Sequence, residues 1–383
     1  MITAEKKCRI LLVIRWPVGG IRTFIRYVYN TFDPERYSFT ILAPKGDETE
    51  IMMQDLKDQD ICYIGIKENP TTAEFMTIVT KEIISEKYHL VHSHGITSGI
   101  SSALPARLKG VRHLMTVHEV LLPKQFQGIK GKMKKVALAS LLPLIDSIHS
   151  VSEDARNNLL EFLPGLKKSN GKCIVVPNGI KSEDFRCCGK RDFRRELGLQ
   201  QDTFLIGFLG RFMSPKGFRY LIDAMELLAK NKNLPKYPLV LAFGYGGFIR
   251  EDRQVVIKKG LEKHFHYLPF TADVGPVLKG LDVVTMPSLW EACPLLPMEV
   301  MVSGVPVIGT SCMGLREVLR DTPGVMVEPA NGQALARAIE SEIKNPSKQR
   351  AEAFIAEAAE RFDVKKQAQK IQNVIEGLLA AAN

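Results

Sequence analysis

Two kinds of hydrophobic spacing alternate along the chain. Short apolar or β-branched runs are bounded by turn residues, and between them apolar residues recur every three or four positions. In the segment after Gly210 these residues form one stripe of a predicted helix: Phe218, Leu221, Ile222, Met225 and Leu228. Ser214-Pro215 is predicted to cap and begin that helix. Strands that alternate with helices in this way are typical of βαβ units and parallel sheets.

The pattern predicts two series of strands. The first series comprises Cys8–Ile14, Tyr37–Ala43, Ile61–Ile66, Leu90–Ser93, His113–Val117, Asp146–Val151 and Cys173–Val176. The second comprises Phe204–Leu209, Pro238–Phe243, Phe265–Leu268, Asp282–Met286, Val305–Ile308 and Val325–Val327. Two doubly wound domains are expected, followed by an amphipathic closing helix over Val364–Leu379.

Composition excludes several classes of protein. The 383 residues are 45% hydrophobic and 25% charged, which is ordinary globular composition and excludes disorder and long coiled coils. No apolar run is long enough to span a bilayer, and Met1–Pro17 lacks the features of a signal peptide, so a cytoplasmic location is expected. The seven cysteines are odd in number and without CxxC spacing, which argues against a disulfide framework and against a zinc site.

The net charge of +10 is concentrated in one region of the first predicted domain. Residues 87–145 hold nine basic residues and one acidic residue, and five of the lysines lie within Lys124–Lys135 beside Phe126, Ile129 and Met133. This combination favours peripheral docking of the protein on an anionic membrane surface, and such docking would bring a lipid-linked or polysaccharide acceptor to it. The alternative is a solvated loop and helix face. Nucleic acid is not expected as a partner, because no recognised binding module accompanies the charge.

Glycines and basic residues follow two of the predicted strands. Gly19 and Gly20 come after the first strand and would let the backbone approach a ligand, although a tight turn explains them equally simply. Arg211 and Lys216 follow the first strand of the second series, where both can point at one anionic group. The alternative for this pair is a solvated basic turn.

Two further loops carry candidate chemistry. Glu291 precedes a helix predicted over 295–303, and Glu299 lies about two turns further on, so both carboxylates can line one cleft and accept hydrogen bonds from sugar hydroxyls. Ordinary surface acids are the alternative. Gly244 opens a glycine-rich strand end suited to close backbone contact with a ligand.

These motifs occur in a fixed order along almost the whole chain: Gly19-Gly20, Val176-Pro177-Asn178-Gly179-Ile180, Gly210-Arg211 with Lys216-Gly217, Pro287-Ser288 with Glu291 and Glu299, Ser303-Gly304-Val305-Pro306-Val307, and Glu317. In order and spacing they resemble the retaining GT-B glycosyltransferases of family 4. The resemblance implies an α/β protein with two Rossmann-like, doubly wound domains facing a cleft and a C-terminal helix that crosses back. We therefore expect an acceptor-binding domain over 1–185, a nucleotide-sugar-binding domain over 186–363 and the closing helix over 364–383.

The resemblance also implies a reaction. A retaining enzyme of this family moves a sugar from a nucleotide-sugar donor to a hydroxyl of a glycan or lipid-linked acceptor, without a metal or other cofactor, as in polysaccharide or glycolipid assembly. Front-face attack would need no protein nucleophile, and Glu291 as a covalent nucleophile is the alternative. A non-catalytic sugar-nucleotide-binding subunit and a nucleotide-sugar epimerase are alternative functions on the same fold.

Roles are implied for the residues that match the family pattern. Arg211 and Lys216 would bind the donor diphosphate, and Glu291 would lie beside the transferred sugar. His118 would lie near the reacting sugar, with a structural histidine as an equal alternative, whereas His94 is expected to be a loop histidine lining the acceptor cleft. Glu299 would hold the ribose, Gly20 would close on the diphosphate, and residues 268–271 would meet the base.

The remaining substrate-binding candidates are Gly19, Gly244, Cys293, Pro294, Leu295 and Glu317. Glu317 matches a frequent acid of the family. Ala292-Cys293-Pro294 stands where many members have Gly-Phe-Gly, which changes the sugar pocket, so the resemblance does not identify the donor sugar.

Overall fold

The computed structural model describes residues 7–168 and 171–381. Three short segments lie outside the described residues: 1–6, 169–170 and 382–383. The first two belong to the predicted first domain and the third to the predicted closing helix. The chain divides into two compact units, Met1–Gly179 with Val364–Asn383, and Ile180–Asp363. The first unit ends a few residues before the predicted boundary at 185, because helix α7 (Glu183–Arg186) packs on other helices of the second unit. The binding roles assigned to the two domains stay predictions.

The first unit contains a parallel sheet of seven strands in the order β3-β2-β1-β4-β5-β6-β7. The strands are β1 (Cys8–Ile14), β2 (Tyr37–Pro44), β3 (Ile61–Ile66), β4 (Leu90–His94), β5 (Arg112–Val117), β6 (Ser147–Ser150) and β7 (Cys173–Val175). The first predicted series is confirmed, with ends that move by one residue. The strand order reverses between β1 and β4, as expected of a doubly wound sheet.

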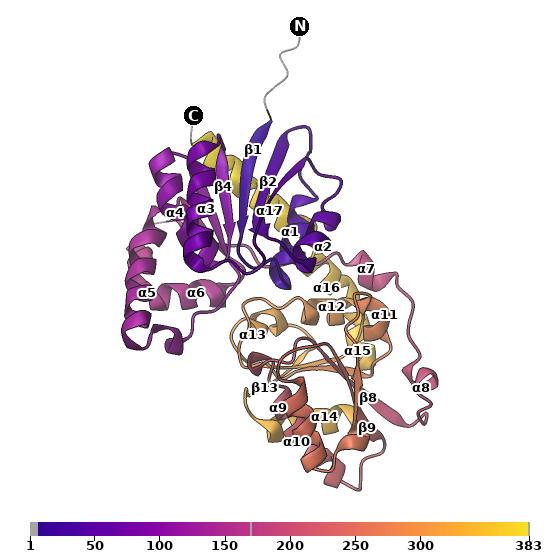
Figure 1. The fold of residues 1–383 in the computed structure, drawn as a ribbon. Coiled ribbons are helices and arrows are strands. Elements are labelled where there is room, and N and C mark those ends of the chain that lie inside the picture. The colour runs from indigo at the N-terminus through magenta and orange to yellow at the C-terminus, as the bar shows by residue number, and fades with distance from the viewer. Residues whose placement is uncertain (1–6, 169–170, 382–383) are drawn as a thin grey trace. The chain divides into compact units, whose positions relative to one another are not determined.

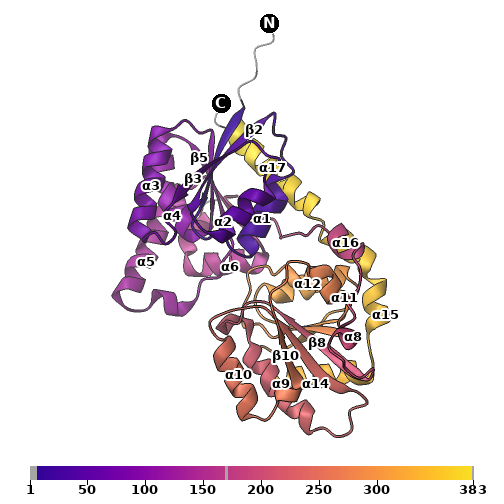
Figure 2. The ribbon, with the colours of Figure 1, turned by 45° about the vertical axis from the view of Figure 1, so that its right-hand side comes forward.

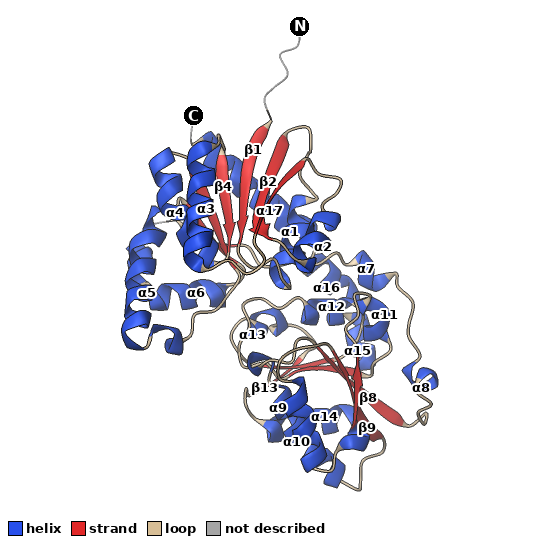
Figure 3. Ribbon diagram, in the orientation of Figure 1, coloured by secondary structure: helices blue, strands red, loops and turns tan. Residues whose placement is uncertain are grey.

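Helices cover both faces of this sheet, as Figures 1 and 3 show. They are α1 (Gly20–Tyr29), α2 (Asp47–Asp55), α3 (Thr72–Ser85), α4 (Ile96–Lys109), α5 (Gly128–Leu141), α6 (Glu153–Phe162) and α17 (Val364–Ala380). Along β1, Leu11 and Val13 pack in one cluster with α3, and Ile10, Leu12 and Ile14 pack in another with α1 and α17. Every residue of that run is buried, because a strand between two helical layers has no solvent face.

Helix α17 belongs to the first unit although it is the last element of the chain, and Figure 2 shows it along α1. Ile371 and Ile375 are buried in the same cluster as β1 and α1. The Tyr37 hydroxyl donates to Glu376 Oε1 at 2.9 Å, and the Gly179 N–H donates to Gln367 Oε1 at 2.8 Å. The predicted amphipathic stripe therefore faces the sheet of this unit.

The second unit contains a parallel sheet of six strands in the order β10-β9-β8-β11-β12-β13. Its strands are β8 (Thr203–Leu209), β9 (Tyr237–Phe243), β10 (Phe265–Leu268), β11 (Val283–Met286), β12 (Val307–Thr310) and β13 (Val325–Val327). The second predicted series is confirmed, with β12 beginning two residues later than expected. The helices are α7 to α16, including α8 (Phe193–Glu196), α9 (Phe218–Lys230), α10 (Ile249–Lys258), α11 (Val274–Lys279), α12 (Leu296–Val302), α13 (Leu315–Leu319), α14 (Gly332–Lys344), α15 (Lys348–Ala353) and α16 (Ile355–Arg361).

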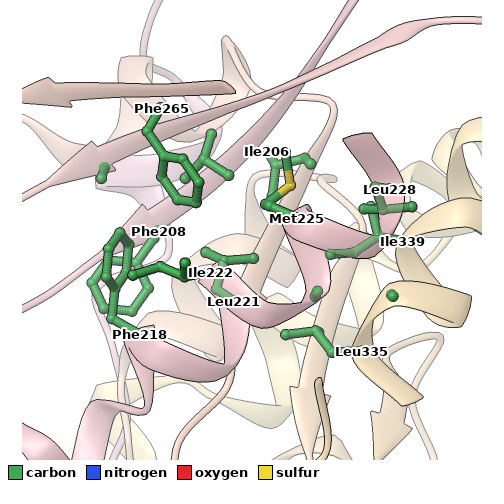
Figure 4. Packing of buried hydrophobic residues seen from close by; sticks show 14 of the residues in the cluster. Ile206, Phe208, Phe218, Leu221, Ile222, Met225, Leu228, Phe265, Leu335 and Ile339 are labelled. Carbon is green, nitrogen blue, oxygen red and sulfur yellow. The ribbon is translucent and has the colours of Figure 1, made fainter. Parts of the chain in front are cut away.

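The stripe predicted on α9 forms the core of the second unit. All five of its apolar residues are buried in one cluster with β8 and α14, shown in Figure 4. The predicted cap is wrong, because Ser214–Lys216 forms a separate 3-10 turn. Gly217 instead occupies the N-cap of α9 with a φ of 66°, a left-handed conformation that glycine adopts without strain.

Replacement of Ile371 by Ala should lower the free energy of unfolding by about 2–4 kcal/mol, because it leaves a cavity between α17 and the sheet. Denaturant unfolding measures this loss. Lys370→Ala is the matched control, since Lys370 is the exposed neighbour on the same helix. Equal stability of the two variants would contradict the packing of α17.

Candidate functional site

Each sheet has one place where the order of its strands reverses. In the second unit this place lies between β8 and β11, and in the first it lies between β1 and β4. Ligands of open α/β sheets bind outside the carboxyl ends of the strands at such points. The loops after these strands therefore define the candidate site of each unit.

In the second unit the loops after β8 and β11 are joined by an ion pair. The Lys216 Nζ atom lies 2.7 Å from Glu291 Oε1, and the two side chains are only 27% and 12% exposed. The Ser288 hydroxyl, which is buried, donates to the same carboxylate oxygen at 2.8 Å. The structure thus brings two of the predicted site residues into direct contact and adds Ser288, which the sequence analysis named within a motif without giving it a role in the site.

Backbone contacts hold these loops in place. The Leu289 N–H donates to the Pro215 carbonyl at 2.8 Å, and the Glu291 N–H donates to the Met313 carbonyl at 3.0 Å. A Cβ atom added to Gly217 would lie 1.9 Å from the Pro287 carbonyl oxygen. Only a residue without a side chain permits this approach, so the glycine beside Lys216 is required by the neighbouring loop.

The other basic residue of the first loop, Arg211, is exposed. Gly244, at the end of β9, lies so close to the preceding loop that a Cβ atom would be 2.0 Å from the Gly210 carbonyl oxygen. Tyr245 and Phe270, which follow β9 and β10, are exposed and form an edge-on pair with ring centroids 5.8 Å apart. Of this pair, Phe270 lies within residues 268–271, which are expected to meet the base.

The remaining predicted residues of this unit lie after β11 and β12. Cys293 and Pro294 are buried and Leu295 is half-buried, immediately before α12. Glu299 lies in the first turn of α12 and Glu317 in the first turn of α13. Since β11 and β12 are neighbours in the sheet, these residues belong to one end of the unit. Their contacts with a donor stay predictions.

In the first unit, Gly19 and Gly20 mark the turn from β1 into α1. Gly19 is the N-cap of α1 with a φ of 55°, and no atom lies within 4 Å of the position of a Cβ at either glycine. His118 follows β5 and is half-buried. The rings of Phe24 and His118 form a T-shaped pair with centroids 5.1 Å apart, and His118 Nε2 lies 3.2 Å from His94 Nδ1.

The expectation that His94 is a loop residue lining a cleft is wrong. His94 is the last residue of β4 and is 1% exposed. Residues 92 and 94 point to the same side of the strand, since side chains alternate along it, and their rings stack with centroids 4.3 Å apart. The signal that could have shown this is the His-Ser-His spacing, which begins inside the predicted strand Leu90–Ser93 and runs one residue past its end.

Burial determines the protonation of these histidines. It lowers the pKa values of His92, His94 and His118 well below the ordinary value, and it lowers the pKa of His149 to about 4. All four rings are therefore neutral at pH 7. Within residues 7–168 and 171–381, no group of three or more His, Cys, Asp or Glu side chains is placed to hold a metal ion.

Comparison with known proteins agrees with this geometry. The model of "Glycosyltransferase Family 4" matches residues 18–184, and the model of "Glycosyl transferases group 1" matches residues 189–361. The two matches follow one another and leave little of the chain outside them. The chain belongs to the family 4 glycosyltransferases.

Curated members of the family show moderate similarity. The chain is 27% identical over 264 residues to "UDP-Gal:alpha-D-GlcNAc-diphosphoundecaprenol alpha-1,3-galactosyltransferase" of Escherichia coli, over 65% of this chain and 64% of that protein. It is 26% identical over 297 residues to a D-inositol 3-phosphate glycosyltransferase of Stackebrandtia nassauensis, over 72% of this chain and 65% of that protein. The chain thus spans slightly less than two thirds of the length of these relatives.

Solved structures confirm the fold. HepE of Anabaena, solved in complex with UDP, superposes with a TM-score of 0.78 at 19% identity, over 96% of this chain and all of that chain. WaaG, a glycosyltransferase involved in lipopolysaccharide biosynthesis, superposes with a TM-score of 0.72 at 15% identity, over 97% of this chain and 100% of that chain. The expected GT-B architecture of two Rossmann-like domains is confirmed.

Replacement of Gly217 by Ala should disrupt the interlocked loops, since the left-handed backbone alone costs about 1–3 kcal/mol and the new Cβ strikes the Pro287 carbonyl. Thermal unfolding should show a lower Tm. Gly247→Ala is the control, because Gly247 has ordinary φ and open space around it. An unchanged Tm for Gly217→Ala would show that the two loops do not pack as described.

Proposed function

We propose that this family 4 protein transfers a sugar from a nucleotide-sugar donor to a hydroxyl of a glycan or lipid-linked acceptor, with retention of configuration and without a metal. The observation that carries the proposal is the Lys216–Glu291 pair, with exposed Arg211 in the same loop as Lys216, at the strand reversal of the second unit. Cations and a carboxylate held together at this point suit a ligand that has both a diphosphate and hydroxyl groups.

The donor diphosphate would bind Arg211 and Lys216. The charge of Lys216 is balanced by Glu291, so Arg211 supplies the uncompensated positive charge, and the ammonium group of Lys216 has further N–H donors for a phosphate oxygen. As the sugar leaves, negative charge grows on the diphosphate. Fixed cations at that position stabilise the transition state more than the ground state and need no metal for this purpose.

Retention would follow from attack on the same face that the leaving group departs, with a phosphate oxygen taking the acceptor proton. The contacts of Glu291 favour this over a covalent intermediate, because one carboxylate oxygen already accepts hydrogen bonds from Lys216 and Ser288. These bonds lower its nucleophilicity and fix its orientation. Glu291 would therefore orient a sugar hydroxyl rather than attack the anomeric carbon.

Other residues would complete the site in the roles that the family resemblance gives them. Glu299 would hold the ribose, and His118 would contact the transferred sugar or the acceptor. Gly19, Gly20 and Gly244 would give backbone access to the ligand. Cys293, Pro294, Leu295 and Glu317 would line the sugar and phosphate end of the second unit.

The first test is calorimetric binding of UDP, GDP and ADP in the presence of EDTA. UDP is the leading nucleotide, because the E. coli relative is named for UDP-Gal and HepE was solved with UDP. Arg211→Ala and Lys216→Ala should each weaken nucleotide diphosphate binding by about tenfold or more, since a charge-assisted hydrogen bond is lost. Arg219→Ala is the control, an exposed arginine on the first turn of α9.

The outcomes separate the alternatives. Binding that persists with EDTA, followed by retained configuration in the product of a lipid-linked acceptor, supports the proposal. Nucleotide binding without transfer would indicate a non-catalytic subunit, and interconversion of the donor sugar would indicate an epimerase. Absence of binding by all three nucleotides would contradict the donor site itself.

We also propose that α5 docks the first unit on an anionic membrane surface. Ile129, Met133 and Val136 lie on one side of α5 and are 79%, 66% and 66% exposed. Lys130, Lys132, Lys134 and Lys135 are exposed on the same helix. An apolar stripe bordered by lysines suits the headgroup region of a bilayer, where a lipid-linked acceptor would reside. Of the helices in the described residues, none is both long and apolar enough to cross a membrane.

Flotation with vesicles tests this docking. The protein should float with vesicles that contain anionic lipid and remain unbound with neutral vesicles, and each lysine removed should weaken partitioning by about fivefold. Lys132→Ala and Met133→Ser probe the charge and the apolar stripe. Leu108→Ser, at an exposed leucine of α4, is the control. Equal binding to neutral and anionic vesicles, or no binding to either, would refute docking through this charge.

A further inference from the structure

A continuous chain of hydrogen bonds runs through the interior of the first unit and ends at His118. His118 Nε2 lies 3.2 Å from His94 Nδ1, and His94 Nε2 lies 3.1 Å from the Tyr29 hydroxyl. That hydroxyl lies 2.6 Å from His92 Nδ1, and His92 Nε2 lies 2.8 Å from the Thr116 hydroxyl. The side chains of His94, Tyr29, His92 and Thr116 are buried. His118, at the end of this chain, is half-buried.

The other end of the chain determines the direction of every bond. The Thr116 hydroxyl lies 3.0 Å from His149 Nδ1, and His149 Nε2 lies 2.8 Å from the carbonyl oxygen of Val176. A carbonyl can only accept, so His149 must carry its proton on Nε2. A neutral imidazole holds one proton, which leaves His149 Nδ1 as an acceptor for the Thr116 hydroxyl.

The same reasoning proceeds along the chain. Thr116 has given its only proton to His149, so it accepts from His92 Nε2–H, and His92 Nδ1 must then accept from Tyr29. The Tyr29 oxygen in turn accepts from His94 Nε2–H. His94 Nδ1 is therefore unprotonated and can only accept from His118.

We propose that this chain, which we name the histidine relay (Val176 carbonyl, His149, Thr116, His92, Tyr29 and His94), holds His118 in the Nε2–H tautomer. The Nδ1 lone pair of His118 is then the acceptor that the ring presents to a substrate hydroxyl. Among the described residues, no hydrogen bond to His118 Nδ1 is present. His94 and Tyr29 act through His118 and are positioning residues, not catalytic residues.

Burial supports this assignment, because each step requires a neutral ring. A second proton on any of the histidines would place two donors against each other or leave a charge in the core, and desolvation opposes that charge. The relay also cannot carry a proton away, since it ends at a carbonyl that has no proton to pass on. Its effect is therefore to orient His118, as an outer hydrogen bond orients a functional histidine in other sites.

The inference deepens the proposed function, since a substrate hydroxyl at His118 rests on sugar transfer, but the tautomer can be measured without turnover. Protein labelled with ¹⁵N-histidine is examined by long-range ¹H–¹⁵N correlation at pH 7, and the His118 signals are assigned by their loss in His118→Gln. The native protein should show a protonated Nε2 and an unprotonated Nδ1. An Nδ1–H tautomer in the native protein would overturn the proposal.

Two variants break the relay at different points while preserving shape. Tyr29→Phe removes the hydroxyl between His92 and His94, and Thr116→Val removes the hydroxyl between His92 and His149. Each should convert His118 to a mixture of both tautomers. His118 signals that remain purely Nε2–H in both folded variants would show that the relay does not determine the tautomer.

His113→Gln is the matched control. His113 is an equally buried histidine of β5, but its Nε2 atom bonds Ser93 and it has no place in the relay. This variant should lower the Tm yet leave the His118 tautomer unchanged, which separates positioning from general loss of stability. UDP binding by the second unit should be the same in all variants, so a failed donor site and a failed relay give different results.

Discussion

Parallel pairing of β8 with β11 is the constraint on which the second unit depends. Val283 and Val284 pair with Ile206 and Gly207, and this short register brings two loops together that are far apart in the sequence. Lys216 and Glu291 meet as a consequence of that pairing. The first unit repeats the arrangement, since pairing of β1 with β4 places the turn at Gly20 beside the strand that ends in His94.

The polar groups at these positions are stabilised by one another. A half-buried ammonium or carboxylate loses hydration, and the loss is repaid only where partners are held at hydrogen-bond distance. Glu291 has two such partners in Lys216 and Ser288, on loops whose backbones bond to each other. Under the proposed function, a diphosphate would share Lys216 with Glu291, so the site is preorganised before the donor arrives.

In the first unit the polar groups lie within the sheet itself. Its sheet carries neutral polar side chains in the interior, where an unpaired group is costly, and those of the histidine relay bond one another in a single line that ends on a main-chain carbonyl. A line of this kind has one arrangement of protons, because its last member can only accept. Under our proposal, this arrangement of protons in the core determines the tautomer of His118, the half-buried ring at the end of the relay.

Much of the fold could be read from the sequence. Strand and helix periods located the strands and the stripe of α9, because burial between helical layers leaves a strong local pattern. The cap at Ser214 failed, since the contact of Gly217 with Pro287 is made by a loop distant in the sequence. His94 was misplaced for a related reason: it lies one residue past the apolar run that located the strand, and the pairing of His94 with Ile14 and Thr116 is what carries β4 on into the core.

The sequence by itself therefore determined the parallel α/β class, the positions of the strands along the chain and the identities of most candidate residues. Only the tertiary structure decided which of them touch: Lys216 with Glu291 and Ser288, and His118 with His94. The physical reason is that periodicity reports whether a residue is buried, whereas hydrogen bonds between side chains depend on which strands are neighbours. Neighbouring strands are set by chain crossings over tens of residues, which no local pattern records.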